Sequence, residues 1–317
     1  MLEGPRDEFR PKLDHVMIMV HDLRAASEDF TRLGFRVRPG GRFPVGIENA
    51  IIPFGLGGPY LELVSIYQPG APDIRDNEEF LAQGEGAMYV GLEVTSAVEI
   101  AKRLRDQGLE VQGPTPGSIK PEGMDGPPVV LWHSVTIQHG ASPRSDPLFF
   151  TEYNRAGQAE LAAKNPEYAR RREAERRIPH PNGANGLAST WFAVDDLERA
   201  TLRYEALGFP RAREYAMDRL RCRVVELALG RGSLRLMKST GHDGPLDKLL
   251  TLHASQLEVP GVTLEVPSID KVLGAIPSDL AATLESSEGT GGRGVIIPPD
   301  LAHGLWVELL ERPDDAA

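Results

Sequence analysis

A repeated order of short secondary-structure elements constrains the fold of this chain more than any other feature. Residues 12–67 predict an apolar strand, a helix that begins after Asp22 and ends at Gly34, and then three more strands. The same order is predicted again from Ala87, from Leu187 and from Val262. The phrases VHDLRAASEDFTRLGF and VDDLERATLRYEALGF are similar enough to indicate duplication of one supersecondary unit.

A single βαβββ unit cannot bury both faces of its sheet, so we expect the units to pair. The predicted fold is therefore α+β, with four βαβββ units paired into two half-barrel domains that carry their helices outside. The domains cover residues 1–153 and 186–317, and a helical linker, residues 154–185, joins them. The middle of the linker, Gln158–Arg177, is rich in Ala, Glu and Arg, which favours a solvent-exposed helix; a basic partner-binding helix is the alternative.

Composition narrows the class of protein. The 317 residues carry a formal net charge of -11, which argues against binding to the phosphate backbone of a nucleic acid. The apolar runs are too short for a membrane-spanning helix, and the charged N-terminus lacks the apolar segment of a signal peptide. Cys222 is the only cysteine, so neither an internal disulfide nor a thiolate metal site is expected. We expect a cytoplasmic protein whose partner is a small molecule, with a homodimer left open.

Three phrases carry a family resemblance: LDHVMIMVHDLRAASEDFTRLGF, then ENAIIPFG followed by YLELVSIY, and DPLFFTEYN. They resemble the vicinal oxygen chelate superfamily, and most of all its glyoxalase-like domain branch. That superfamily contains glyoxalases, extradiol dioxygenases, fosfomycin-resistance proteins and methylmalonyl-CoA epimerases. The resemblance implies a divalent metal held by the first and last strands of two paired units. It does not select one reaction, because this fold hosts many chemistries.

The resemblance places four ligand positions in the N-terminal half, at His15, Glu62, Tyr89 and Glu152. We expect His15, Glu62 and Glu152 to be metal ligands, because one imidazole and two carboxylates make an open site that suits manganese, magnesium, nickel, zinc or iron. Glu152 is also a candidate general base. Tyr89 is predicted to be a core residue, with a substrate contact as the alternative. The competing interpretations are a structural His15 and a Glu62 on a solvated face.

The matching positions of the C-terminal half are Ser189, Arg235, Gly261 and Glu308. Arg235 would bring a positive charge to the place of the metal, so we predict that it forms an ion pair with Glu308 in a degenerate half. Extradiol dioxygenases of this superfamily take two imidazoles from such C-terminal positions, and Ser189 and Gly261 supply none.

Further polar residues could act on a substrate. His133 and His139 lie on or just after a strand of the second unit and are candidates for proton transfer, with a structural role as the alternative. Asn49 could donate a hydrogen bond to substrate. The first functional hypothesis is a metal-dependent lyase or isomerase that stabilises an enolate. The alternatives are a metal-free binding or resistance protein and an extradiol-type dioxygenase.

Overall fold

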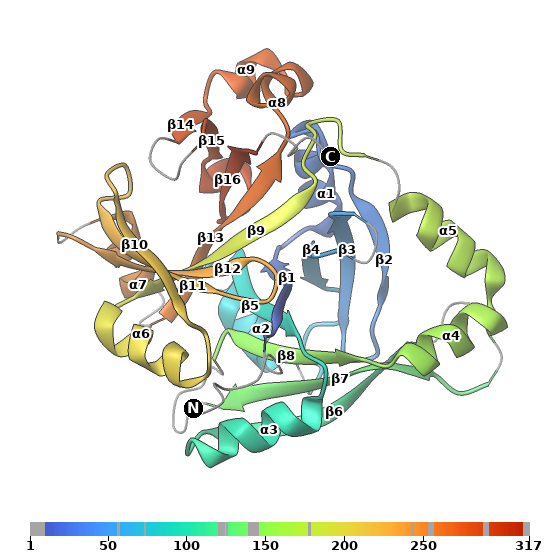
Figure 1. The fold of residues 1–317 in the computed structure, drawn as a ribbon. Helices are drawn as coiled ribbons and strands as arrows, with labels where there is room; N and C mark the ends of the chain where they lie inside the picture. Colours follow the sequence, from blue (N-terminus) through green and yellow to red (C-terminus); the bar gives the residue numbers. More distant parts are fainter. Residues whose placement is uncertain are drawn as a thin grey trace, which may run out of the picture.

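The structure is a computed structural model with an α+β fold, in which helices cover the outer side of a large curved sheet (Figure 1). The α+β class predicted from the sequence is confirmed. The chain is described over residues 10–55, 58–72, 74–119, 124, 126–138, 146–176, 179–241, 244–252, 257–287 and 292–312.

The N-terminal strands form a sheet in the order β2-β3-β4-β1-β5-β8-β7-β6. Strand β1 runs parallel to β4 and antiparallel to β5, and β5 runs parallel to β8. The strands are β1 (Lys12–Met19), β2 (Arg38–Arg42), β3 (Ile47–Pro53), β4 (Tyr60–Ile66), β5 (Gly86–Glu93), β6 (Glu110–Ile119), β7 (Val129–Gln138) and β8 (Leu148–Tyr153). The helices of this half are α1 (Leu23–Arg32), α2 (Arg75–Leu81) and α3 (Ala97–Asp106).

The C-terminal strands repeat the same pairing in the order β10-β11-β12-β9-β13-β16-β15-β14. The two sets of strands meet where Val259 of β13 pairs with Ala87 of β5. The strands are β9 (Gly186–Val194), β10 (Arg211–Met217), β11 (Cys222–Ala228), β12 (Ser233–Ser239), β13 (Leu257–Val266), β14 (Glu285–Ser287), β15 (Gly294–Ile297) and β16 (Trp306–Glu311). The helices are α6 (Leu197–Ala206), α7 (Pro245–Leu252), α8 (Ile269–Ala275) and α9 (Ser278–Ala281), with a 3-10 turn at Pro299–Leu301.

The predicted helix starts after Asp22 and Asp196 are confirmed. The carboxylate of Asp22 accepts from the backbone N–H groups of Arg24 and Ala25, and that of Asp196 accepts from the N–H of Arg199. These bonds satisfy donors that the first helical turn leaves without a partner. Both α1 and α6 therefore begin in the same way, as expected of a duplicated unit.

Alternation along β1 gives the N-terminal sheet two different faces. Leu13, Val16 and Ile18 lie in the main core on the outer face, together with residues of α1. Met17 and Met19 lie on the opposite, inner face, where Phe80 and Leu81 of α2 join them. The sequence prediction did not include α2, or α7 in the matching connection of the C-terminal half. Each is a short helix that covers one end of an inner face.

Helices α4 (Arg155–Lys164) and α5 (Pro166–Arg176) occupy the stretch expected to form a linker. The side chain of Asn154 begins α4 by accepting from the N–H of Gly157. The residues of α5 whose burial is described are largely exposed. Figure 1 shows both helices at one side of the sheet. Arg177, the last residue of the predicted helix, lies outside the described residues.

His180 anchors the return of the chain from α5 to the N-terminal half. Its Nδ1 accepts from the N–H of Arg36 at 2.8 Å, so its Nε2 carries the hydrogen and donates to the carbonyl of Pro53 at 2.9 Å. Burial lowers the pKa of His180; the Pro53 carbonyl opposes this, and the charge of Arg36 adds to it. The neighbouring Asn182 side chain donates to the carbonyl of Leu33. Residue 34 has to be Gly here, because its φ is +80° and a Cβ would approach Asn182 Cβ to 2.9 Å.

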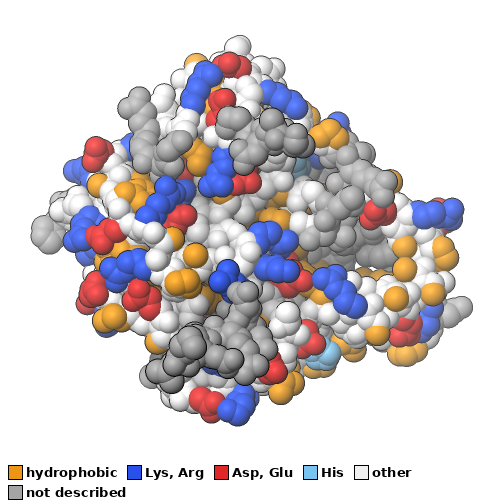
Figure 2. Space-filling view, viewed as in Figure 1, with side chains coloured by type: hydrophobic (Ala, Val, Ile, Leu, Met, Phe, Trp, Pro, Cys, Tyr) orange, Lys and Arg blue, Asp and Glu red, His pale blue; other side chains and the backbone are white. Residues whose placement is uncertain are grey.

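On the face drawn in Figure 2, Lys and Arg side chains stand beside Asp and Glu side chains, and apolar side chains are scattered between them. Large exposed apolar side chains occur singly, at Val45, Val98 and Leu202. Among the described helices, none is both long and apolar enough to cross a membrane.

We predict that His180→Ala lowers the free energy of unfolding by about 2–4 kcal/mol, because the N–H of Arg36 and the carbonyl of Pro53 lose their partner and a cavity remains. Because the folded state lowers the pKa of His180, the unfolded state takes up the proton first as the pH falls. The stability of the natural protein should therefore decrease as the pH drops below about 6.5. Urea unfolding from pH 7.5 to 5 measures both effects. His21→Ala, at an exposed side chain, is the control, and an identical pH slope in His180→Ala would contradict the assignment.

Candidate functional site in the N-terminal sheet

A β-bulge turns two consecutive side chains of β1 toward the inner face. The pairing of β1 with β5 shifts between Leu13 and His15, so Asp14 is an extra residue. An extra residue of this kind interrupts the alternation of a strand and lets Asp14 and His15 share one side. Leu13 before them and Val16 after them both point into the outer core. Gly91, the partner of His15 on β5, makes room for the imidazole, because a Cβ there would lie 2.5 Å from its Cε1.

The imidazole of His15 lies between two carboxylates. Its Nδ1 is 2.6 Å from Asp14 Oδ2, and its Nε2 is 3.8 Å from Glu62 Oε2. The ring of Tyr60 stacks on it with centroids 4.6 Å apart and planes at 5°, and Phe149 meets it edge-on at 5.2 Å. His15 is 6% exposed, whereas the Glu62 side chain keeps 15% of its surface exposed. Of these two side chains, Glu62 is the more exposed.

Both carboxylates are held by further side chains. Asp14 Oδ2 also accepts from the hydroxyl of Tyr153 at 2.7 Å. Glu62 accepts from Asn49 Nδ2 at 2.5 Å, and Asn49 Oδ1 in turn accepts from the N–H of Gly41 at 2.8 Å. We call Asp14, His15, Asn49, Glu62 and Tyr153 the inner-face cluster. Its members come from β1, β3, β4 and β8, so both units of the N-terminal half contribute to it.

The two neighbouring carboxylates make His15 a stronger base than an isolated imidazole. Burial lowers the pKa of His15, but the hydrogen bond to Asp14 and the charges of Asp14 and Glu62 outweigh it, so the net pKa is raised. Burial, and then the nearby carboxylate of Asp14, raise the pKa of Tyr153 well above its ordinary value. Burial likewise raises the pKa of Tyr60. Both phenols therefore remain hydrogen-bond donors at neutral pH.

The strand registers define which residues of the second unit correspond to His15 and Glu62. His15 pairs with Gly91 and Met17 pairs with Tyr89, so exchanging β1 with β5 relates His15 to Tyr89 and Met17 to Gly91. Glu62 is the parallel partner of Met17 on β4, and Phe149 is the parallel partner of Gly91 on β8. Phe149 thus corresponds to Glu62. The second unit offers two aromatic rings, 6.2 Å apart and nearly perpendicular.

Glu152 does not join the expected ligand set. Its Oε2 accepts from the N–H of Ala97 at 2.8 Å, at the start of α3, where the helix dipole favours a negative charge. Glu311 does the same in the C-terminal half, where it accepts from the N–H of Ile269 at the start of α8. The sequence alignment placed the β8 ligand position three residues too late. Because side chains alternate, an odd shift moves the residue to the opposite face of the sheet.

His133 also lies on the outer face. It is the cross-strand partner of Glu152, and Val135 of the same strand is the partner of Phe150 in the outer core. The structure therefore separates His133 from His15. His139 lies outside the described residues.

The first unit supplies two side chains that fit a metal ion, whereas the second unit supplies no imidazole or carboxylate. His15 Nε2 and Glu62 Oε2 face each other, and Asp14 and Asn49 orient them as outer-shell partners would. Tyr89 and Phe149 supply no carboxylate or imidazole beside them. Within the described ranges, no three His, Cys, Asp or Glu side chains come together as a metal-binding group. The expected His15, Glu62 and Glu152 site is not assembled.

Of the two substrate candidates, Asn49 reaches the cluster through Glu62, as described above. Tyr89 is half-buried on the inner face, among the apolar side chains that surround Met19. The sequence interpretation missed Asp14, Tyr60, Phe149 and Tyr153. Asp14 and Tyr153 stand directly beside the predicted ligands His15 and Glu152, but a bulge and an uncertain register hide the side to which they point.

The predicted ion pair of the C-terminal half is confirmed. Arg235 Nη1 lies 2.7 Å from Glu308 Oε2, and the two side chains are 1% and 0% exposed. The hydroxyl of Thr263 accepts from Arg235 and donates to Glu308 at 2.7 Å, and Ser287 donates to the second carboxylate oxygen. The Trp191 indole fills the space over Gly261, where a Cβ would lie 2.6 Å from the ring. This donor set does not fit the two-imidazole iron site of an extradiol dioxygenase.

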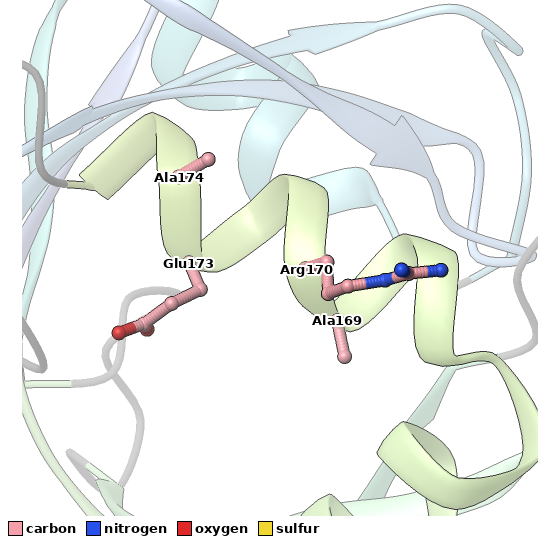
Figure 3. A pocket seen from close by; sticks show the side chains of 4 residues that line it. All are labelled: Ala169, Arg170, Glu173 and Ala174. Carbon is pink, nitrogen blue, oxygen red and sulfur yellow. The ribbon is translucent and has the colours of Figure 1, made fainter.

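A cavity of about 580 Å³ lies against α5 (Figure 3). The described residues that line it are Ala169, Arg170, Glu173 and Ala174, all from α5. None of the inner-face cluster is among them. The cavity is therefore separate from the chemistry at His15.

Comparisons with known proteins agree with this architecture. A family model described as a glyoxalase-like domain matches residues 13–208, more than half of the chain. The chain belongs to this glyoxalase-like family. No curated protein matches the sequence.

Three solved structures illustrate the relation. A hypothetical protein from Staphylococcus aureus has a TM-score of 0.62 and 11% identity, covering 96% of this chain and 100% of its own. A mutant of 4-hydroxymandelate synthase from Streptomyces coelicolor has a TM-score of 0.60 and 15% identity, covering 97% of this chain and 94% of its own. Methylmalonyl-CoA epimerase from Mycobacterium tuberculosis has a TM-score of 0.37 and 22% identity, covering 43% and 93%. The first two show the predicted glyoxalase/dioxygenase-like fold.

We predict that Arg235→Met lowers the free energy of unfolding by about 3–5 kcal/mol, because it leaves the Glu308 carboxylate buried without its counter-charge. The double substitution Arg235→Met with Glu308→Gln should be closer to the natural protein, since no charge then remains buried. Urea denaturation of the three proteins measures the difference. If Arg235→Met were as stable as the natural protein, the Arg235–Glu308 pair would not be a structural substitute for the metal site that the compared positions would otherwise form.

Proposed function

We propose that this chain is an enzyme of isomerase or lyase type, which moves a proton on a small oxygenated molecule at the inner face of the N-terminal sheet. The observation that carries this proposal is the position of His15, held between Asp14 and Glu62 with Nε2 turned toward the partly exposed carboxylate. An imidazole placed in this way is a typical general base.

The contacts around His15 assign a role to each group. Asp14 accepts from Nδ1, which orients the ring and leaves Nε2 as the atom that exchanges a proton with substrate. Tyr153 fixes Asp14, and Asn49 fixes Glu62. When Nε2 removes a proton from a carbon next to a carbonyl, the electron pair moves to the carbonyl oxygen as an enolate. The two carboxylates stabilise the imidazolium that forms.

Two outcomes follow from the same enolate. Return of the proton to the other face of the carbon, or to a neighbouring atom, gives an isomer. Loss of a leaving group from the adjacent carbon gives an unsaturated product, with the proton of His15 passed to the leaving group. Both outcomes balance without an oxidant or reductant. Because the second unit does not complete a metal site, no step of this proposal uses a metal, and metal dependence is an alternative to be tested.

A metal-free binding protein is the second candidate. It is favoured by three half-buried aromatic side chains of the inner face: Tyr60 and Phe149 pack on His15, and Tyr89 packs on Phe149. Aromatic rings of this kind bury a large apolar area against a small ligand. Saturable binding without turnover would support this second candidate.

We predict that His15→Gln lowers turnover by at least about 100-fold, the typical contribution of a general base. The assay follows deuterium uptake from D2O by NMR, with a panel of small hydroxy-ketones, 2-oxo acids and dicarbonyl compounds. His133→Gln is the matched control, because that imidazole lies on the outer face and should leave exchange unchanged. Equal loss in both variants would contradict the role of His15.

The same assay separates the metal-dependent alternative. Exchange by the natural protein should survive treatment with a chelator and gel filtration. Loss of exchange that a single divalent ion restores would favour the metal-dependent lyase or isomerase. Oxygen uptake with a catechol panel would instead favour the dioxygenase alternative.

A further inference from the structure

We infer that the second unit of the N-terminal sheet recognises its ligand by aromatic contact, with Tyr89 and Phe149 standing where a second pair of metal ligands would stand. The ligand class is a small molecule with a flat, unsaturated part next to its reactive carbon. This inference rests on the site of the proposed function, but its principal test measures metal binding and needs no turnover.

In the C-terminal half, the two residues that correspond to Glu62 and Phe149 lie close together. Arg235 is the parallel partner of Trp191 on β9, and Glu308 is the parallel partner of Thr263 on β13. These registers match those of Glu62 and Phe149. Arg235 and Glu308 nevertheless meet at 2.7 Å, from strands that are not adjacent in the sheet. In a pair of units, the side chains at these positions on the two last strands therefore point toward each other.

The same convergence is visible in the N-terminal half. Phe149 of β8 reaches His15 of β1, and Tyr89 reaches Phe149. The position that holds a carboxylate in the first unit therefore holds a phenyl ring in the second. Phe149 has no donor atom, and a neutral phenol at Tyr89 is a poor partner for a divalent ion compared with imidazole.

The aromatic side chains of the inner face favour a planar ligand over a coordinated metal ion. Tyr60, Tyr89 and Phe149 are each half-buried, so none of these residues is sealed in the core. Aromatic rings attract other planar groups by offset or edge-on contact, which adds to the burial of apolar area. A flat substrate would pack on these rings while its acidic C–H group points to His15 Nε2.

The inference is tested by restoring the missing ligands. In the double substitution Tyr89→His with Phe149→Glu, the four compared positions, 15, 62, 89 and 149, would carry two imidazoles and two carboxylates. This variant should bind zinc or manganese at least about 100-fold more tightly than the natural protein, a change of about 2.7 kcal/mol in binding free energy. Isothermal titration with each metal alone, followed by metal analysis after dialysis, measures the gain.

A matched control places the same groups out of register. In Tyr89→His with Thr151→Glu, the new carboxylate lies on the same strand, two residues beyond the compared position, and should give a smaller gain. Adding His15→Ala to the first double variant should remove the gain. If the double variant does not fold by circular dichroism, Tyr89→His alone supplies a third ligand and should still bind metal more tightly than the natural protein.

Two outcomes would overturn the inference. One is a natural protein that retains one equivalent of metal through dialysis. The other is a folded double variant with no gain in affinity over the out-of-register control. For the ligand class, Phe149→Leu should raise the KM of a conjugated substrate several-fold with little change in kcat, and leave a saturated analogue unaffected. An equal effect on both analogues would contradict ring recognition while leaving the role of His15 intact.

Discussion

The antiparallel pairing of β1 with β5 is the constraint on which the rest of the N-terminal half depends. This pairing joins two units into one sheet and determines which residues of one unit face those of the other. The bulge at Asp14 belongs to this pairing, and it brings a carboxylate and an imidazole to the same face. Gly91 leaves the space that the imidazole occupies. Because β8 is paired with β5, the same register also brings Phe149 to His15 and Tyr153 to Asp14.

The two halves share one architecture, but the C-terminal half buries its charged pair whereas the N-terminal half leaves Glu62 partly exposed. In the C-terminal half, Arg235 and Glu308 are fully buried, and such a pair is tolerated only when hydrogen bonds satisfy its remaining atoms. Thr263 and Ser287 provide such bonds to Arg235 Nη1 and to both oxygens of Glu308, while Arg235 Nε lies 3.8 Å from the carboxylate of Glu226. Trp191 fills the remaining space. In the N-terminal half the carboxylate of Glu62 stays partly exposed. The hydrogen-bond partners of Glu62 fix its side chain but leave it partly exposed, as exchange with a ligand requires.

Alternation along strands explains why some site residues could be predicted and others could not. The family resemblance placed His15 and Glu62, and the structure brings these two side chains together. The segment Leu148–Tyr153 contains two aromatic residues and a Thr before Glu152, and its pattern fits more than one register. Glu152 then appeared as a ligand, whereas it binds the first N–H of α3. Its duplicate Glu311 shows that this is a repeated structural feature.

The sequence by itself determined the order of the elements, the Asp22 and Asp196 helix starts, and the opposite charges that meet at Arg235 and Glu308. The element order and the helix starts follow from local rules, because caps, alternation and the duplicated phrases are encoded over short stretches of chain. The charge pair followed from the positions that the family resemblance implies. Only the tertiary structure decided that Asp14 holds His15, that Tyr153 holds Asp14, and that Phe149 lies between His15 and Tyr89. Those contacts depend on a bulge and on the register between strands distant in sequence, where a shift of one residue reverses the face of every side chain.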